Sequence, residues 1–219
     1  MRNVIDGALV ITLLVCIGFH LWGRFPHEIV GTIMLACFII HNVLNIKWYK
    51  NIFKGKYTAM RWLFTATLLL VLADALVLMW SSMVISHHVF TFLPPLGPRR
   101  LARFLHTFSA YWGLVLMSFH LGLHWIKFTN MLKIREMSQT SRKMLKLFGL
   151  IICAYGIFAF IDRGCIDYIT MVTPRVSIAT GETTLKFYAD MLAIMGAGIF
   201  LGNGLTGYLI HRNRKSKSV

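Results

Sequence analysis

Six long apolar runs are the feature that most constrains how this chain can fold. They cover approximately residues 4–22, 28–46, 62–84, 104–126, 146–166 and 186–210. A helix of about 20 apolar residues crosses the ~30 Å hydrocarbon core of a bilayer and satisfies its own backbone hydrogen bonds there. The sequence therefore predicts an all-α integral membrane bundle of six transmembrane helices, forming a single domain over residues 1–219.

The composition favours lipid as the environment. Hydrophobic residues make up 57% of the chain and charged residues 14%, whereas soluble domains have roughly 45–50% and 25%. The net charge of +15 comes from basic residues clustered in the short segments between the apolar runs. That distribution is typical of membrane topology, so we expect membrane lipid and no nucleic acid as a partner.

The distribution of Lys and Arg predicts the orientation. Sixteen of the 23 lie on the side that includes both termini and the segments 47–61 and 127–146, and seven lie on the other side. The more basic side of a membrane protein faces the cytoplasm. We therefore expect a multi-pass protein of the cytoplasmic membrane with both termini inside. The polar segment 163–186 is expected to lie as a cap on the outer face.

Two histidine pairs occur at the same spacing on two of the predicted spans. His27 and His41 are 14 residues apart on the second, and His106 and His120 are 14 apart on the fourth. Fourteen residues rise about 21 Å through nearly four helical turns, so both imidazoles of a pair share one helix face. Since the two spans run in the same direction, His27 can lie level with His106 and His41 with His120. Two facing imidazoles suit iron in a planar macrocycle, which predicts haem b at two levels.

Neighbouring residues complete the candidate cofactor site and leave one alternative open. His124 lies one turn after His120 and could be the inner ligand instead. Gly31 and Gly113 are small enough to let a bulky group approach. Arg103 could pair with a haem propionate. We predict no catalytic residue.

Two motifs resemble a known family. The fourth run contains His120-Leu121-Gly122-Leu123-His124-Trp125, and the second contains Pro26-His27-Glu28. Together they are similar to the flavinylation-associated cytochromes of bacterial membranes. The resemblance implies a haem-b cytochrome working with flavin-bearing partners on the outer face. It also implies candidate ligands at His27, His41, His106, His120 and His124.

The leading hypothesis is a di-haem b-type cytochrome that transfers electrons across the bilayer. Its donor would be a quinol or lie on the cytoplasmic side, and its acceptor, such as a flavoprotein, would lie on the outer face. Such a chain is an electron-transfer subunit of an oxidoreductase rather than a stand-alone enzyme, and the sequence leaves open whether one haem or two bind. The alternative is a proton- or metal-coupled transporter that uses the intramembrane histidines. Transporters usually have inverted repeats and broken helices, whereas the two histidine-bearing spans here run in the same direction.

Overall fold

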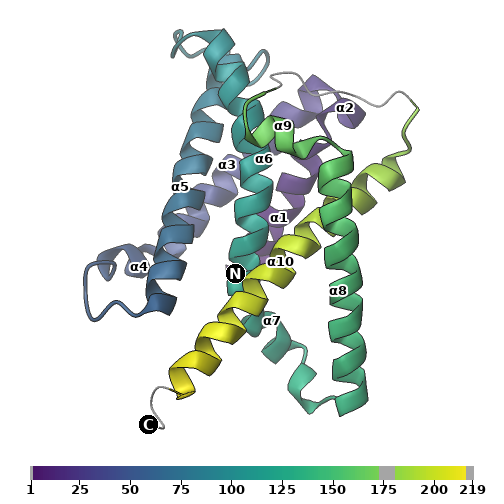
Figure 1. Ribbon diagram of the computed structural model, residues 1–219. Helices are drawn as coiled ribbons and strands as arrows, with labels where there is room; N and C mark the ends of the chain where they lie inside the picture. The colour runs from purple at the N-terminus through teal and green to yellow at the C-terminus, as the bar shows by residue number, and fades with distance from the viewer. Residues whose placement is uncertain (1, 173–180, 216–219) are drawn as a thin grey trace. The chain divides into compact units, whose positions relative to one another are not determined.

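A computed structural model describes residues 2–172 and 181–215 of the chain (Figure 1). Within these ranges the protein is all-helical and has no strand. The helices are α1 Arg2–Ile17, α2 Phe19–Trp22, α3 Arg24–Leu44, α4 Ile46–Lys50, α5 Ala59–Ile85, α6 Arg99–Leu123, α7 Trp125–Met131, η1 Ile134–Glu136, α8 Gln139–Asp162, α9 Cys165–Ile169 and α10 Thr184–Lys215.

Among the described residues, four helices are long and apolar enough to cross a membrane. They are α3, α5, α8 and residues Thr184–Arg212 of α10. Large apolar side chains lie on their outer surfaces, among them Leu70, Phe158 and Leu201, which are each more than half exposed. Exposed apolar area of this extent marks a surface that faces something other than water. The chain therefore has the helices of a membrane protein.

The other two predicted spans differ from a simple spanning helix. The first is divided into α1, which has only 16 residues, and the short α2. The fourth corresponds to α6, whose 25 residues suffice in length. Its histidines, its hydroxyl-bearing residues and the arginines at its beginning make it less apolar than the four spanning candidates. Six spans thus remain an expectation for these two helices.

A close contact lies at Gly18, where the first predicted span is interrupted. A Cβ atom added to Gly18 would lie 2.6 Å from the hydroxyl oxygen of Tyr188. Trp22 donates a hydrogen bond of 2.6 Å from Nε1 to the same hydroxyl. Because Tyr188 is far away in the sequence, the local apolar pattern contains no sign of this break.

The described helices fall into two compact units that alternate along the chain. Unit 1 comprises Met1–Lys56, Asp74–Tyr111 and Asp167–Tyr188, and unit 2 comprises Tyr57–Ala73, Trp112–Ile166 and Ala189–Val219. Single-domain organisation stays a prediction. Of the predicted outer cap, α9 and the residues that follow it to position 172 are described, whereas residues 173–180 lie outside the described residues.

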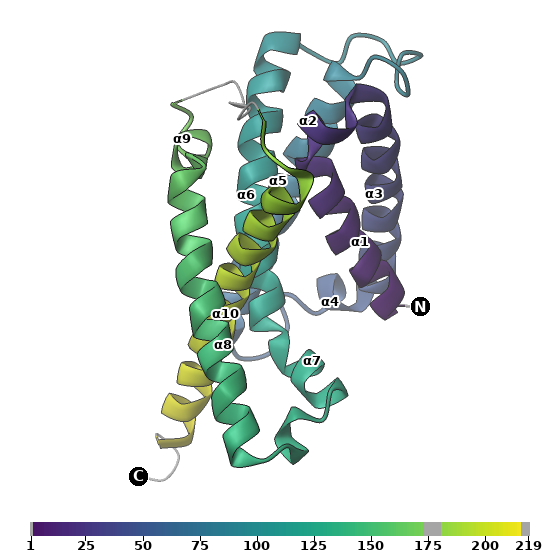
Figure 2. The same ribbon diagram turned by 90° about the vertical axis from the view of Figure 1, so that its right-hand side faces the viewer.

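Within unit 1, α1 packs along α3 (Figure 2). The two helices are also joined by polar contacts near their ends. Arg2 donates 2.8 Å from Nη2 to the carbonyl oxygen of Leu44, and Asp6 contacts His41. This packing holds α3, which carries two of the candidate histidines, against the first helix of the chain.

Within unit 2, glycines let α6 and α8 approach α10 closely. A Cβ atom on Gly156 of α8 would overlap the backbone carbonyl of Ala193, and one on Gly198 of α10 would lie 2.5 Å from Cβ of Ser118. Gly202, four residues after Gly198, approaches the backbone of α6 in the same way. Small residues at a spacing of four are typical of helix packing in membranes, where van der Waals contact replaces hydrophobic exclusion.

A buried ion pair also joins α8 and α10. Asp190 is 2% exposed and accepts hydrogen bonds from Arg163 Nη2 at 2.7 Å and Arg163 Nε at 2.9 Å. Tyr155 donates 2.5 Å to the other carboxylate oxygen. Both carboxylate oxygens thus have donors within unit 2, as a buried charge requires.

Candidate functional site

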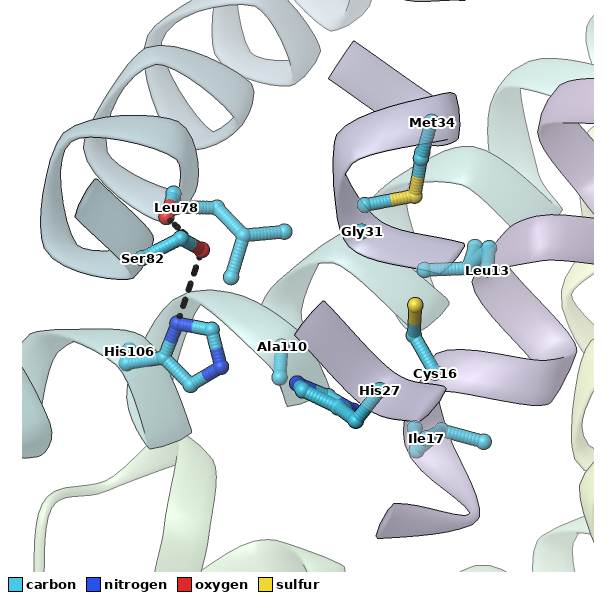
Figure 3. A pocket seen from close by; sticks show the side chains of 10 residues that line it. All are labelled: Leu13, Cys16, Ile17, His27, Gly31, Met34, Leu78, Ser82, His106 and Ala110. Carbon is cyan, nitrogen blue, oxygen red and sulfur yellow. Dashed lines mark hydrogen bonds between the residues drawn. The ribbon is translucent and has the colours of Figure 1, made fainter. Parts of the chain in front are cut away.

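The rings of His27 and His106 face each other inside unit 1. His27 lies in the first turn of α3, and His106 lies two turns into α6. Their ring centres are 5.9 Å apart and their planes meet at 75°. Figure 3 shows both rings beside Ala110, pointing toward the same space. The equal spacing of the two histidine pairs predicted that His27 and His106 lie at the same level. Their role as ligands stays a prediction.

A cavity of about 40 Å³ adjoins the two rings. Helices α1, α3, α5 and α6 all contribute to its wall (Figure 3). Most of the lining is apolar, and besides the two histidines the only polar side chains in it are those of Cys16 and Ser82. A polar pair in an otherwise apolar wall is the arrangement expected of a cofactor pocket.

Two serines on α5 determine which nitrogen of His106 carries hydrogen. Ser81 Oγ and Ser82 Oγ each donate to the carbonyl oxygen of Leu78, at 2.9 and 2.7 Å. Since a hydroxyl has one hydrogen, both serines can only accept from His106 Nδ1, which lies 3.4 and 3.3 Å away. This arrangement favours the tautomer of His106 that carries its hydrogen on Nδ1 and its lone pair on Nε2.

His27 has a buried nitrogen without a partner. Its Nδ1 is inaccessible to solvent, and none of the described residues forms a hydrogen bond with it. The edge of Phe19 packs against the ring at a centre distance of 5.1 Å. One turn along α3, a Cβ atom added to Gly31 would meet nothing within 4 Å. The site thus combines an imidazole that has one unpartnered nitrogen, Nδ1, with open space beside it.

The pair fits the axial ligands of one iron. Two imidazole nitrogens on opposite sides of a metal, each about 2.0–2.1 Å from it, place their ring centres roughly 6 Å apart. The angle between the rings is unrestricted, because each ring can rotate about its own metal–nitrogen bond. The cavity itself is far smaller than a porphyrin. A haem would fit between the two rings only if the side chains between α3 and α6 moved apart.

His41, on the same helix, is held by two polar neighbours. Its Nδ1 lies 2.8 Å from Oδ1 of Asp6, and Asn45 Nδ2 lies 3.4 Å from its Nε2. An amide nitrogen can only donate, so the imidazole donates from Nδ1 to the carboxylate and keeps its lone pair on Nε2. Carboxylate–histidine pairs of this kind commonly orient metal ligands. Sequence reasoning assigned Asp6 no role, although an acid within an apolar run was a usable signal.

The remaining candidate histidines belong to unit 2. The ring centres of His120 and His124 are 4.8 Å apart, and Phe64 packs edge-on at 5.0 Å from His124. The break between α6 and α7 falls at His124. Gly113 is buried in α6. Because His41 belongs to unit 1 and these residues to unit 2, the inner pair stays a prediction, with His120 and His124 both open.

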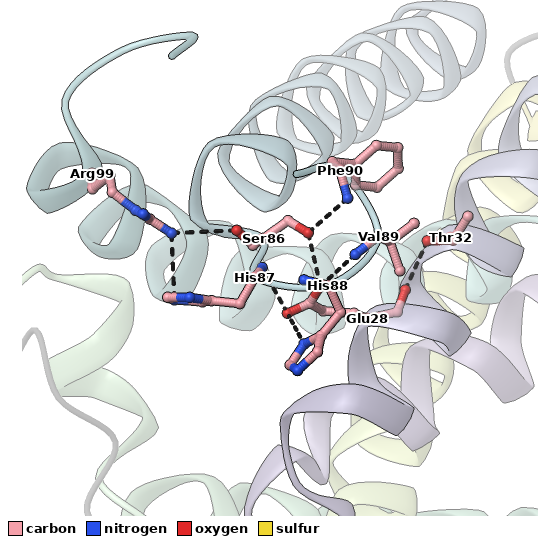
Figure 4. Close-up of polar contacts among 8 residues, drawn as sticks. All are labelled: Glu28, Thr32, Ser86, His87, His88, Val89, Phe90 and Arg99. Carbon is pink, nitrogen blue, oxygen red and sulfur yellow. Dashed lines mark hydrogen bonds and ion pairs between the residues drawn. The ribbon is translucent and has the colours of Figure 1, made fainter. Parts of the chain in front are cut away.

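Glu28 forms a polar cluster that sequence reasoning missed (Figure 4). Its carboxylate accepts hydrogen bonds from the backbone N–H groups of His87, His88 and Val89 at 3.0, 2.9 and 3.2 Å. Ser86 Oγ donates to it at 2.7 Å. The cluster ties the segment after α5 to the first turn of α3, next to His27. An acid beside a candidate ligand was visible in the sequence, but its partners lie about 60 residues away.

The described residues contain no group of three or more His, Cys, Asp or Glu side chains that could hold a metal ion by themselves. A haem needs only two axial side chains, so that finding does not bear on the pair. Arg103 is exposed in the first turns of α6. Comparison with family models, with curated proteins and with solved structures finds no match for this chain.

Proposed function

We propose that this protein is a membrane-bound b-type cytochrome in which His27 and His106 ligate one haem. The observation that carries the proposal is the 5.9 Å separation of the two ring centres, which matches the distance expected for two imidazoles on one iron. The orphaned Nδ1 of His27 and the open space at Gly31 support it. When bound, haem b supplies reversible one-electron oxidation and reduction of its iron.

The chain's own residues orient the ligands and keep water away. Ser81 and Ser82 hold the Nδ1 hydrogen of His106, so the ring presents Nε2. Apolar residues of α1 and α3, such as Leu13 and Met34, form most of the remaining wall. A dry wall of this kind limits solvent access to a redox centre, which is one way a protein sets its potential.

We further propose a second haem at the inner level, about 21 Å deeper along the helices. His41 would be one ligand, and His120 or His124 the other. The hydrogen bond between His41 and Asp6 supports this role, because it leaves the lone pair on Nε2, which Asn45 would give up to a metal. Two haems at these depths would form an electron path across most of the bilayer.

The membrane arrangement belongs to the same proposal. Six spanning helices with both termini in the cytoplasm follow from the apolar runs and the charge distribution. The resemblance to flavinylation-associated cytochromes supports a flavoprotein acceptor on the outer face, and the electron donor would be a quinol or lie on the cytoplasmic side. The chain would then act as the electron-transfer subunit of an oxidoreductase.

The test is haem content, measured by absorbance spectra of the purified protein in its oxidised and dithionite-reduced forms. We expect about two haems per chain, with the sharp reduced bands of bis-histidine b haem. His27→Ala and His106→Ala should each retain about one, because each removes an axial ligand of the same haem. His41→Ala should remove the other.

His211→Ala is the matched control, because His211 is exposed near the end of α10. It should keep the full haem content. Circular dichroism establishes whether each variant retains its helices, and added imidazole should restore the lost haem to a folded His27→Ala. A wild-type protein without haem overturns the proposal. Full haem content in His27→Ala or His106→Ala overturns the assignment of this pair.

A further inference from the structure

A short amphipathic segment follows the end of α3 in unit 1. This α4 segment comprises residues 46–54, that is, α4 and the turn after it. Asn45 separates it from α3, with a φ of −104° and a ψ of 14° (Figure 1). Backbone hydrogen bonds from Asn51 to Trp48, of 3.0 Å, and from Lys54 to Asn51, of 3.1 Å, continue the helical turns after α4. Residues three or four positions apart in the segment therefore share a face.

One face of the α4 segment is cationic. Lys47, Lys50 and Lys54 are spaced by three and four residues, and all three side chains are exposed. The sequence contains no acidic residue between Glu28 and Asp74. The segment therefore presents three ammonium groups without a carboxylate among its sequence neighbours.

The end of α3 adds a further cation beside the α4 segment. Arg2 donates a hydrogen bond of 2.8 Å from Nη2 to the carbonyl oxygen of Leu44, the last residue of α3. Asp6 is the only acid of α1, and its Oδ1 lies 2.8 Å from Nδ1 of His41. Positive charge thus accumulates where α3 ends, while the nearby acid of the packed helix is engaged by a histidine.

A second face of the α4 segment is apolar and exposed at both ends. Ile46, Tyr49 and Phe53 have the same spacing as the lysines, one position earlier. Ile46 is 49% exposed and Phe53 is 94% exposed. Between them, the hydroxyl of Tyr49 donates to Oδ1 of Asn42 on α3, and the ring of Tyr49 packs edge-on against Trp48 at a centre distance of 5.1 Å. These contacts tie the middle of the segment to α3 and leave its apolar ends uncovered.

We propose that the α4 segment is an interfacial anchor in which Lys47, Lys50 and Lys54 bind the phosphate groups of anionic phospholipids. Because α3 is long and apolar enough to cross a membrane, the segment that follows it lies at the membrane surface. A helical segment with lysines on one face and aromatic or aliphatic side chains on the other lies in the plane of that surface. Its lysines attract anionic headgroups, and its apolar side chains enter the boundary of the acyl chains. The anchor does not depend on the haem.

The test is hydrogen–deuterium exchange of the full-length protein, measured by mass spectrometry on peptides that cover residues 46–54. The protein is placed in nanodiscs of phosphatidylcholine alone and in nanodiscs that also contain phosphatidylglycerol. We expect the amides of the α4 segment to exchange roughly five- to tenfold more slowly in the anionic nanodiscs, because headgroups bound to several lysines oppose local opening. Inorganic phosphate added to the neutral nanodiscs should leave the exchange unchanged.

Two variants test the role of the lysines, and a third is the control. Replacing all three lysines by glutamine should abolish the difference between the two kinds of nanodisc. Replacing them by arginine should preserve it, which separates the loss of charge from a loss of folding. The control removes the same number of exposed positive charges from the beginning of α8 and should keep the wild-type difference: Arg142→Gln, Lys143→Gln and Lys146→Gln.

Four results would overturn the anchor. The first is equal exchange of the wild-type segment in the two kinds of nanodisc. The second is a glutamine variant that keeps the difference, or an arginine variant that loses it. The third is an equal loss in the α8 control, because the effect would then belong to the overall charge of the protein. The fourth is equal slowing by inorganic phosphate, which would make the segment a site for soluble anions.

Discussion

The hydroxyl groups of Ser81 and Ser82 control the electronic character of His106. Both are used as donors to Leu78, so both accept from His106 Nδ1. A hydrogen bond at Nδ1 increases electron density at Nε2 and thereby stabilises oxidised iron. Their effect is therefore expected in the redox potential rather than in the presence of the cofactor.

The double variant Ser81→Ala/Ser82→Ala should retain its haems but raise the midpoint potential of the one ligated by His106, by roughly tens of millivolts. Potentiometric titration followed by absorbance measures the shift. Ser118→Ala is the control, because Ser118 is equally buried but hydrogen-bonds only Leu114 within α6. An unchanged midpoint potential in the double variant would show that the two serines do not influence this haem.

At the scale of helices, glycine contacts determine how α6, α8 and α10 pack. At Gly156 and Gly198 the space for a Cβ atom is already occupied by a neighbouring helix. Close approach of this kind lets backbones make extensive van der Waals contact, which is the main source of packing energy between helices in lipid. Sequence reasoning did not use this run of glycines, although Gly198 and Gly202 have the spacing of a membrane packing motif.

Gly156→Ala should lower the stability of the protein by about 1–3 kcal/mol, because the added methyl group overlaps the Ala193 carbonyl and the helices must separate. Gly207→Ala is the matched control on α10, since a Cβ atom there would meet nothing within 4 Å. It should be neutral or stabilising, as alanine favours a helix. Thermal unfolding in detergent, followed by circular dichroism, distinguishes the two. Equal unfolding temperatures would contradict this account of the packing.

For the whole molecule, the decisive quantity is the number of membrane crossings. In the part of the chain that the structure describes, four helices qualify by length and composition, whereas the sequence predicted six spans. The two counts differ in whether α1 and α6 cross. With the N-terminus inside in both cases, they place the segment between α5 and α6 on opposite sides of the membrane, so a topology experiment can separate them.

With six spans, reporters fused after Leu96 and after Met137 should lie on opposite sides of the membrane, because α6 crosses between them. Alkaline phosphatase, which is active only outside, should be active after Leu96 and inactive after Met137. A green fluorescent protein fused at each site should give the complementary pattern. If both positions report the same side, α6 does not span and the six-helix arrangement is wrong.

The helical class and the four strongest spans could be predicted from the sequence. They depend on local properties, namely the length of an apolar run and the need of each backbone group to bond within its own helix in lipid. The proximity of His27 to His106 could also be predicted, because helix geometry fixes how far apart residues 14 positions apart lie on each helix.

The other features required contacts between distant residues. Tyr188 packs against Gly18, Ser81 and Ser82 lie beside Nδ1 of His106, and Glu28 holds the segment that bears His87. Only the tertiary structure decides these, because each depends on which side chains meet across helices and not on the periodicity of any one of them.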